Sequence, residues 1–393
     1  MRDQLADYPS RLAAAASITD QQRRTITKRI ELLSTILHTT FLPCWRYKML
    51  IRRFSDVARS SLTIIAATTL AITCESSASA TPPSGKLIKD REQLATKNDA
   101  KQEIQTEAVA IASGGFKREA FVLAPRSKYG SRPAVIVLHG GTRGANDIFK
   151  WTSWPKLAER EKFLLVAPQG VNNQWNDGRD VTISGTRSTA DDVGFLSSLI
   201  ETLIRDYGAD PRAIFVTGVS NGGLMSMRLG CEKPSLVGAI APVISTMPEV
   251  IAQMCRSARP LPAMFMAGTA DPLMPYDGTP NAFLLARGNN TPMLSMPATL
   301  DLWRARNGCT VKGVAKDLPN LNKNDRSTVT RIEYRTCKSG APVIHYRVND
   351  GGHREPRMPP QEIRGRFAQL GPQNGDIDGP EEIWRFFTTQ IDR

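Results

Sequence analysis

The sequence predicts a single α/β domain with a mostly parallel central sheet and helices on both faces. Short apolar runs bounded by Gly, Pro or Asp recur from about residue 107 onward, and continuous apolar runs are typical of strands covered on both faces. Amphipathic stretches lie between several of these runs, and strands that alternate with helices favour a parallel sheet. A Gly-x-Ser-x-Gly pentapeptide at 218–222 also follows one of the runs, at a strand-to-helix junction.

The expected strands begin with a hairpin, in which Ala108–Ala112 and Arg118–Leu123 flank Gly114-Gly115. The later apolar runs predict buried strands at Ala134–Leu138, Phe163–Val166, Ala213–Val216, Val237–Ile244, Ala263–Met266 and Val343–Val348. No internal repeat or low-complexity tract interrupts them, so we expect one domain over 106–393.

One helix is clearly marked between two of these strands. Apolar residues recur at spacings of three and four from Val193 to Tyr207, Ser188 with Asp191 resembles a capping box, and Gly208 marks the end. A shorter helix is expected at Leu224–Leu229, directly after the pentapeptide.

The N-terminal region has the order of a secretory signal peptide over 49–80. Basic residues precede an apolar run and a small-x-small site, with cleavage expected before Thr81: Arg52, Arg53, Arg59, Leu62–Ile72 and Ala78-Ser79-Ala80. The apolar run is too short for a stable membrane span. We therefore expect a secreted protein, extracellular or periplasmic.

The segments around this signal have their own interpretations. Residues 1–48 are expected to be an extension that precedes the true start at Met49, and 81–105 form a polar, flexible lead-in. A degenerate twin-arginine signal at Arg52-Arg53 and a lipid anchor on Cys74 remain alternatives.

The basic balance does not indicate nucleic-acid binding. The formal net charge is +13, but residues 1–80 hold 11 Lys and Arg against 6 Asp and Glu, so 5 of these charges belong to the leader. The remaining +8 is spread along the chain without a Lys/Arg-rich run or a known binding motif. We expect a solvated surface and no nucleic-acid partner.

Four cysteines lie outside the leader: Cys231, Cys255, Cys309 and Cys337. An even set in an exported protein is normally oxidised, and four cysteines allow three pairings. The sequence-local pairing, Cys231–Cys255 and Cys309–Cys337, closes loops of modest length and is the one we expect. Buried free thiols are the alternative.

Ser220 is the candidate nucleophile. It lies at the centre of Gly218-Val219-Ser220-Asn221-Gly222, between an apolar strand and a short helix. This is the context of the nucleophile in an α/β-hydrolase fold, where Gly on both sides allows a sharp turn. A serine nucleophile needs a base, and the base needs an orienting acid.

The small number of histidines selects the base. There are 4, and in this fold the chain order is nucleophile, acid, histidine, which leaves His345 and His353 as candidates. His345 lies within a predicted strand, whereas His353 follows Asp350-Gly351-Gly352 in a Gly-rich loop. We predict His353 as the base and assign His139 a structural role.

Asp271, in a loop after the strand Ala263–Met266, is the candidate acid, and Asp277 is the alternative. The oxyanion donors are expected to be the backbone N–H groups of Asn221 and Gly141. Glycines at 140 and 141 let the backbone approach a substrate closely.

Six short motifs follow one another along the chain: Leu-His-Gly-Gly141, Trp175-Asn-Asp-Gly, Ala190-Asp-Asp-Val-Gly-Phe195, Gly-Val-Ser-Asn-Gly-Gly223, Gly-Thr-Ala-Asp-Pro-Leu-Met-Pro-Tyr276 and Gly-Gly-His353. Over roughly 108–390 the chain resembles the polyhydroxybutyrate depolymerase/feruloyl esterase family of secreted carboxylic-ester hydrolases. The resemblance implies Ser220, Asp271 and His353 as a triad and a disulfide-linked segment at Cys309 and Cys337. Trp175 is a further candidate, for a substrate pocket. Many relatives have an aromatic residue where this chain has Glu355.

The candidate triad predicts two-step acyl transfer without a metal or organic cofactor. The resemblance implies hydroxyalkanoate esters or oligomers as substrates. Feruloyl or acetyl-xylan esters are the alternative substrates, and a peptidase or a non-catalytic binding protein of the same fold are more distant alternatives. Glu381–Phe387 is expected to be the closing helix of the same domain. With no linker and polymer-binding module after it, we expect a soluble ester substrate.

Overall fold

The computed structural model describes residues 106–125, 130–179, 188–279, 291–358, 360 and 369–391. The chain divides into two units, Met1–Gln102 and Glu103–Arg393, and the second contains all of the described residues. The predicted extension, signal peptide and lead-in over 1–105 lie outside the described residues.

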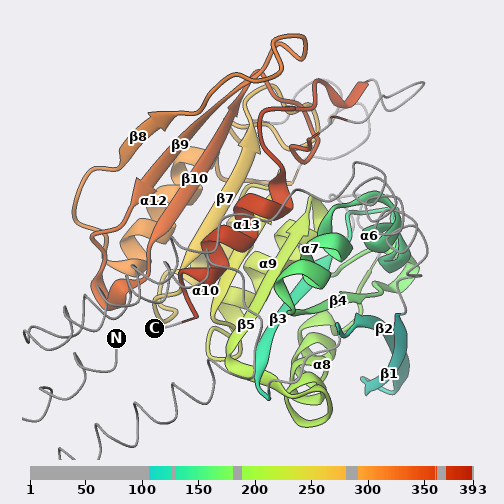
Figure 1. Ribbon diagram of the computed structural model, residues 1–393. Coiled ribbons are helices and arrows are strands. Elements are labelled where there is room, and N and C mark those ends of the chain that lie inside the picture. Colours follow the sequence, from blue (N-terminus) through green and yellow to red (C-terminus); the bar gives the residue numbers. More distant parts are fainter. Residues whose placement is uncertain are drawn as a thin grey trace, which may run out of the picture. The chain divides into compact units, whose positions relative to one another are not determined.

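The second unit is built on a sheet whose strands lie in the order β1-β2-β4-β3-β5-β6-β7-β10-β9-β8 (Figure 1). In this spatial order, the six neighbouring strands β4, β3, β5, β6, β7 and β10 pair in parallel. The strands at each edge of the sheet pair antiparallel with their neighbours. The strands are β1 Glu107–Ser113, β2 Phe116–Leu123, β3 Arg132–Leu138, β4 Leu164–Pro168, β5 Ala209–Val219, β6 Ala239–Val243, β7 Ala263–Gly268, β8 Val314–Asp317, β9 Thr328–Tyr334 and β10 Val343–Asn349.

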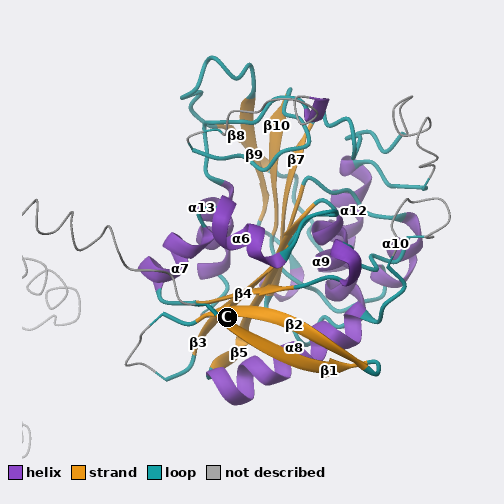
Figure 2. Cartoon of the chain, turned by 90° about the vertical axis from the view of Figure 1, so that its right-hand side faces the viewer, coloured by secondary structure: helices purple, strands orange, loops and turns teal. Residues whose placement is uncertain are grey.

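Helices cover both faces of the sheet (Figure 2). On one face lie α8 Asp192–Tyr207, α9 Asn221–Glu232, α10 Glu249–Cys255 and α12 Met296–Asn307. On the other lie α6 Ala145–Trp151, α7 Trp154–Glu161 and α13 Gly379–Thr388. The predicted α/β class with a mostly parallel sheet is confirmed.

Alternation along the central strands divides the core between these faces. On β3, Ile136 packs toward the α8 and α9 side, whereas Val135 and Val137 pack toward the α7 and α13 side. All three are at most 2% exposed, which explains why this strand appears in the sequence as a continuous apolar run.

The start of α8 differs from the sequence prediction. Asp191, rather than Ser188, is the N-cap, and its carboxylate accepts a hydrogen bond from Gly194 N. Ser188 instead accepts from Ala190 N, within the turn before the helix. The helix ends as predicted, because Gly208 adopts a left-handed conformation at its C-cap.

Both disulfides have the sequence-local pairing. Cys231–Cys255 joins the C-terminal end of α9 to α10, and Cys309–Cys337 joins the segment after α12 to the segment after β9. The first bond therefore ties the helix that follows Ser220 to a neighbouring helix.

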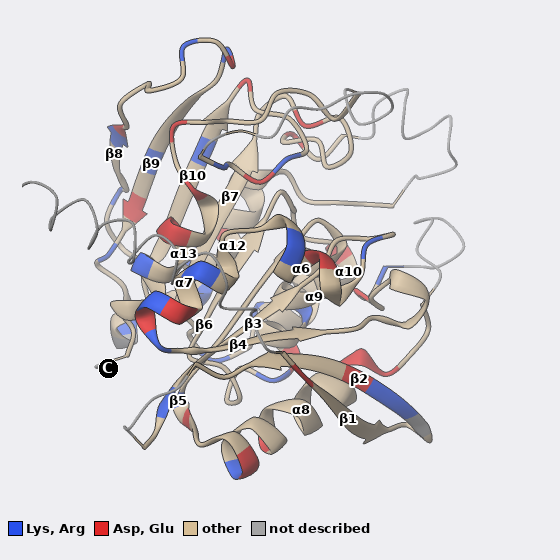
Figure 3. Cartoon of the chain, turned by 45° about the vertical axis from the view of Figure 1, so that its right-hand side comes forward, with Lys and Arg blue, Asp and Glu red and all other residues tan. Residues whose placement is uncertain are grey.

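Charged residues of both signs are interspersed on the described surface helices (Figure 3). Arg160 on α7, for example, forms two hydrogen bonds to Glu381 on α13. None of the helices in the described part of the chain is both long and apolar enough to span a bilayer.

Candidate active site

Ser220 lies at the carboxyl end of β5, in a sharp turn into α9. Its backbone has φ 57° and ψ −120°, a conformation that non-glycine residues rarely adopt. A Cβ on Gly222 would lie 2.3 Å from the carbonyl oxygen of Leu138, and one on Gly218 would lie 2.5 Å from the carbonyl carbon of Gly222. The two glycines therefore permit the close approach of β3, β5 and α9 that exposes the serine.

The elbow is also held by the turn after β6, which sequence reasoning did not single out. The hydroxyl of Ser245 donates to the Ser220 carbonyl at 2.8 Å, and Ser220 N donates to Val243 O at 2.9 Å. Ile244, between them, has φ 47°, which is strained for a β-branched residue. No sequence pattern marks this turn, because its role depends on a long-range contact.

Ser220, His353 and Asp271 form a continuous hydrogen-bonded chain. His353 Nε2 lies 2.9 Å from Ser220 Oγ, and His353 Nδ1 lies 2.8 and 3.0 Å from the two Asp271 oxygens. An imidazole protonated at Nδ1 donates to the carboxylate and leaves Nε2 to accept the Ser220 hydroxyl proton. The structure thus brings together the three residues predicted as a triad.

Each partner of the serine is held by its own loop. Asp271 Oδ1 accepts the backbone N–H groups of Leu273 and Met274, both at 2.8 Å. His353 N donates to Leu370 O at 2.6 Å, and Gly352 N donates to Pro372 O at 2.9 Å. The histidine and its acid are 7% and 5% exposed, so water has little access to their contact.

The alternative acid and base occupy other positions. Asp277 is exposed and its carboxylate accepts from Thr279 N within a turn. His345 is fully buried on β10, where Nδ1 faces Phe265 O at 3.3 Å and Nε2 faces the Tyr276 hydroxyl at 2.9 Å. Burial lowers the pKa of His345 to about 4, so this imidazole is neutral near pH 7.

The two predicted oxyanion donors lie on segments next to Ser220, since a Cβ on Gly140 would lie 3.8 Å from the Cβ of Ser220. Asn221 is the first residue of α9, and Gly141 lies in the loop after β3. The N–H groups of their neighbours are occupied, since Thr142 N donates to Asn173 O and Arg143 N donates to Gly140 O. The N–H groups of Gly141 and Asn221 have no backbone acceptor among the described residues. This leaves them available to a developing negative charge, and the helix N-terminus favours such a charge.

His139 supports this loop rather than the serine. Its Nε2 accepts from Gly170 N at 3.0 Å, which requires Nδ1 to carry the proton, and Nδ1 lies 2.9 Å from Gly140 O. Burial lowers the pKa of His139, so the neutral ring is favoured.

Trp175 has a different position from the one predicted. Its side chain is 0% exposed and packs against His139, with ring centroids 4.9 Å apart. It therefore does not form the wall of a substrate pocket in this structure. The Trp-Asn-Asp-Gly pattern marked an important segment, but spacing alone did not reveal that the indole is buried.

Glu355, two residues after His353, lies against the start of α13. A Cβ on Gly379, the first residue of α13, would lie 2.9 Å from Glu355 Cγ. Asp378, directly before Gly379, is the N-cap of this helix. Burial, with a contribution from the Asp378 carboxylate, raises the pKa of Glu355 to about 8.

No group of three or more potential metal ligands occurs among the described residues.

No family model matches the chain. NocK of Nocardia uniformis subsp. tsuyamanensis, provisionally named an esterase, is 28% identical over 262 residues, which are 66% of this chain and 75% of NocK. Feruloyl esterase B of Piromyces equi is 29% identical over 195 residues, 49% of this chain and 33% of that protein. A poly(3-hydroxybutyrate) depolymerase of Ralstonia pickettii is 30% identical over 125 residues, 30% of this chain and 26% of that protein.

The chain thus spans about three quarters of NocK but about a third or less of the other two proteins. These are the kinds of protein that the motifs resemble, which confirms the predicted resemblance. Among solved structures, an acetyl xylan esterase from Aspergillus awamori overlaps with a TM-score of 0.44 at 15% identity, covering 62% of this chain and 92% of that chain. The strand order and the elbow after β5 identify the α/β-hydrolase fold.

Proposed function

We propose that this chain, whose relatives support a carboxylic-ester hydrolase of the α/β-hydrolase type, is a serine esterase that forms an acyl-enzyme on Ser220. The observation that carries the proposal is the hydrogen-bonded chain from Ser220 Oγ through His353 to Asp271. A hydroxyl in this arrangement is activated by the adjacent imidazole, which the buried carboxylate orients.

In the first step, Ser220 Oγ attacks the ester carbonyl while its proton passes to His353 Nε2. The new C–O bond converts the carbonyl oxygen into an oxyanion, which accepts hydrogen bonds from the N–H groups of Gly141 and Asn221. Asp271 stabilises the imidazolium. Collapse of the intermediate breaks the bond to the alcohol, which leaves with the proton from His353.

In the second step, His353 takes a proton from water as the water oxygen attacks the acyl carbon. The bond to Ser220 Oγ then breaks, the proton returns to this oxygen, and the carboxylic acid is released. Every proton in both steps moves between His353 Nε2 and the reacting oxygens, so neither step requires another acid or base.

Hydroxyalkanoate esters or oligomers are the substrates we propose first, in line with the matched segment of the depolymerase. Feruloyl esters are the second candidate, in line with the matched segment of feruloyl esterase B. A panel of p-nitrophenyl acyl esters, soluble hydroxybutyrate oligomers, methyl ferulate, acetylated xylo-oligosaccharides and peptide amides separates these classes. Hydrolysis of the peptide amides alone would contradict the esterase assignment.

The role of Ser220 is tested by Ser220→Ala and by fluorophosphonate labelling. We expect turnover to fall on the order of 10⁶-fold, labelling to disappear, and the thermal midpoint to change little, since the hydroxyl is not part of the packed core. Retention of more than a few per cent of wild-type turnover would show that another residue is the nucleophile.

Export to an oxidising compartment is part of the same proposal. Two disulfides support it, since such bonds persist in extracellular and periplasmic proteins. Mass spectrometry of the exported protein should find Thr81 at the N-terminus and link Cys231 to Cys255 and Cys309 to Cys337. Free thiols would contradict export to an oxidising compartment, and a lipid on Cys74 would contradict soluble release.

A further inference from the structure

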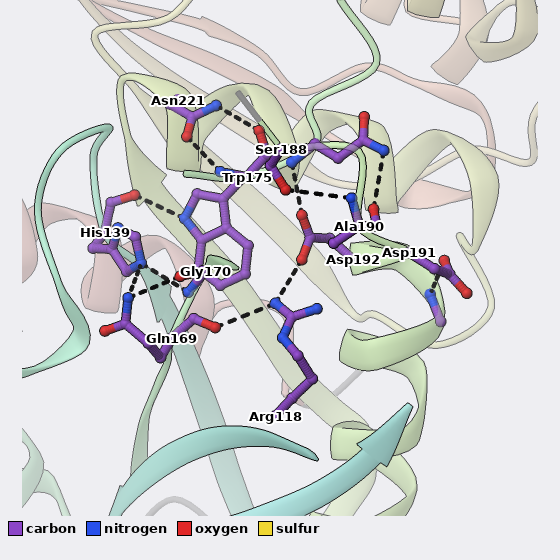
Figure 4. Close-up of polar contacts among 12 residues, drawn as sticks. Arg118, His139, Gln169, Gly170, Trp175, Ser188, Ala190, Asp191, Asp192 and Asn221 are labelled. Carbon is purple, nitrogen blue, oxygen red and sulfur yellow. Dashed lines mark hydrogen bonds and ion pairs between the residues drawn. The ribbon is translucent and has the colours of Figure 1, made fainter. Parts of the chain in front are cut away.

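Residues 169–177, here termed the brace segment, contact both of the backbone segments that carry the proposed oxyanion donors (Figure 4). Trp175 touches both through different atoms. Its indole Nε1 donates to the carbonyl of His139 at 2.9 Å, at the start of the Gly140-Gly141 loop. Its backbone N–H donates to Asn221 Oδ1 at 2.8 Å, at the start of α9.

The Asn221 side chain completes a two-way link with the brace segment. Its Nδ2 donates to the Trp175 carbonyl at 3.0 Å and to Asp177 Oδ2 at 2.6 Å. All three contacts use the side chain, so they orient the residue without using its backbone N–H. Asn221 is 3% exposed, and its side-chain carboxamide is therefore not available to solvent.

The brace segment is itself anchored to the sheet and to α8. Asn176 N donates to Asp192 Oδ2 at 2.6 Å, and Arg118 on β2 forms a buried ion pair with the other oxygen of Asp192 at 2.6 Å. Asp177 pairs with Arg179 at 2.8 Å, with both side chains at most 6% exposed. These anchors account for the Trp-Asn-Asp-Gly and Ala-Asp-Asp motifs, which the triad chemistry leaves unused.

We propose that Trp175 and Asn221 are positioning residues that hold the Gly141 and Asn221 N–H groups at a fixed separation around the oxyanion. The proposal rests on the proposed function, because it concerns the same reaction. Trp175 is 0% exposed and Asn221 is 3% exposed, and the hydrogen bonds of both side chains are made to the protein, so we assign them a role in positioning the donors rather than in contact with the substrate. Donors that are fixed before the reaction stabilise the tetrahedral intermediate without reorganisation, and their displacement by a fraction of an ångström lowers turnover.

Trp175→Phe and Asn221→Ala test the link from each side. The first removes the indole N–H and keeps an aromatic ring, and the second removes the amide and keeps the backbone donor. We expect kcat to fall about 10- to 100-fold in each variant while KM changes by less than about threefold. The affinity for phenylboronic acid, which forms a tetrahedral adduct on the serine, should fall by a similar factor. The pH at which kcat/KM reaches half its maximum should stay unchanged, since the triad is intact.

Two residues of α12, outside the contacts of the brace segment, provide matched controls. Trp303 on α12 is a fully buried tryptophan whose indole N–H has no acceptor among the described residues. Asn307 is a fully buried asparagine that bonds Leu261 N and Leu261 O at 3.0 and 2.7 Å, as Asn221 does with Trp175. Trp303→Phe and Asn307→Ala should lower the thermal midpoint but leave kcat and boronate affinity within about twofold of wild type. Each rate is divided by the concentration of active sites, measured as the serine that a fluorophosphonate has labelled when the reaction is complete.

Ser220→Ala, measured in the same series, separates this inference from the proposed function. If Ser220→Ala stays active, the nucleophile is wrong and the proposed function fails. If it is inactive while Trp175→Phe and Asn221→Ala keep wild-type kcat and boronate affinity, only the positioning role is overturned. Equal losses of kcat in the two control variants would also overturn it, because the effect would then follow lost packing in general.

Discussion

His345 makes the stability of the folded protein depend on pH in a predictable direction. The imidazole is fully buried, and burial lowers its folded-state pKa from 6.5 to about 4. Below pH 6.5 the unfolded chain binds a proton that the folded protein excludes, so the free energy of unfolding decreases as the pH falls toward 4. Below the folded-state pKa both states are protonated and the decrease ends.

The size of this effect follows from the two pKa values. Linkage gives a loss of about 2 kcal/mol between pH 7 and pH 5 from this one group. That is a large fraction of a typical folding free energy of about 5–15 kcal/mol. Protonation would also disrupt the contact in which His345 Nε2 accepts from the Tyr276 hydroxyl, five residues after Asp271.

The assay is urea unfolding at pH 7 and pH 5, with disulfides intact, for wild type and His345→Gln. The glutamine is neutral at both pH values and can still accept a hydrogen bond. We expect its free energy of unfolding to decrease by about 2 kcal/mol less than that of wild type between the two pH values. Other titrating groups are common to both proteins and cancel in this difference. Equal decreases in the two proteins would refute the argument that the buried imidazole is neutral.

Three further changes test the site and its surroundings. His353→Ala should reduce kcat/KM about as severely as loss of the serine, whereas His345→Gln should keep most of the activity at pH 7; the reverse order in an ester assay would exchange their roles. Gly222→Ala should abolish activity and lower the thermal midpoint, because the new Cβ would lie 2.3 Å from the Leu138 carbonyl oxygen; unchanged values of both would contradict the tight elbow. Glu355→Gln should have a higher thermal midpoint than wild type, by a margin that grows from pH 5 to pH 9. The folded-state pKa of Glu355 is about 8, so the unfolded chain loses this proton first as the pH rises, and wild type is destabilised. A constant difference in midpoint across this range would show that Glu355 ionises normally.

The fold could be predicted where strong local patterns and burial agree. The central strands are covered on both faces, so β3, β5 and β7 appear in the sequence as apolar runs. By contrast, β8 is exposed along its length and contains Val, Ala, Lys and Asp, so its composition does not distinguish it from a loop. Its pairing with β9 depends on a neighbour that lies more than ten residues away in the chain.

The site was predictable as far as chain order and chemistry could sort the candidates. The small number of histidines and the Gly-rich loop selected His353, which lies beside Ser220 and Asp271 in the structure. The buried position of Trp175 could not be predicted, because its hydrogen bonds to Asn221 join residues 46 apart and depend on backbone geometry. A tryptophan near a site fits a pocket wall and a buried support equally well until the direction of its indole is known.

The three residues of the candidate triad follow three different parallel strands, β5, β7 and β10, and the contacts between them span 82 and 133 residues of sequence. Contacts of such separation carry a cost in loop-closure entropy, and long-range strand pairing is generally slow, so we expect these contacts to form late in folding. Catalytic geometry consequently exists only in molecules that have completed the sheet as far as β10. In a refolding experiment, recovery of esterase activity should therefore lag behind recovery of helical signal, and its time course reports when β10 joins β7.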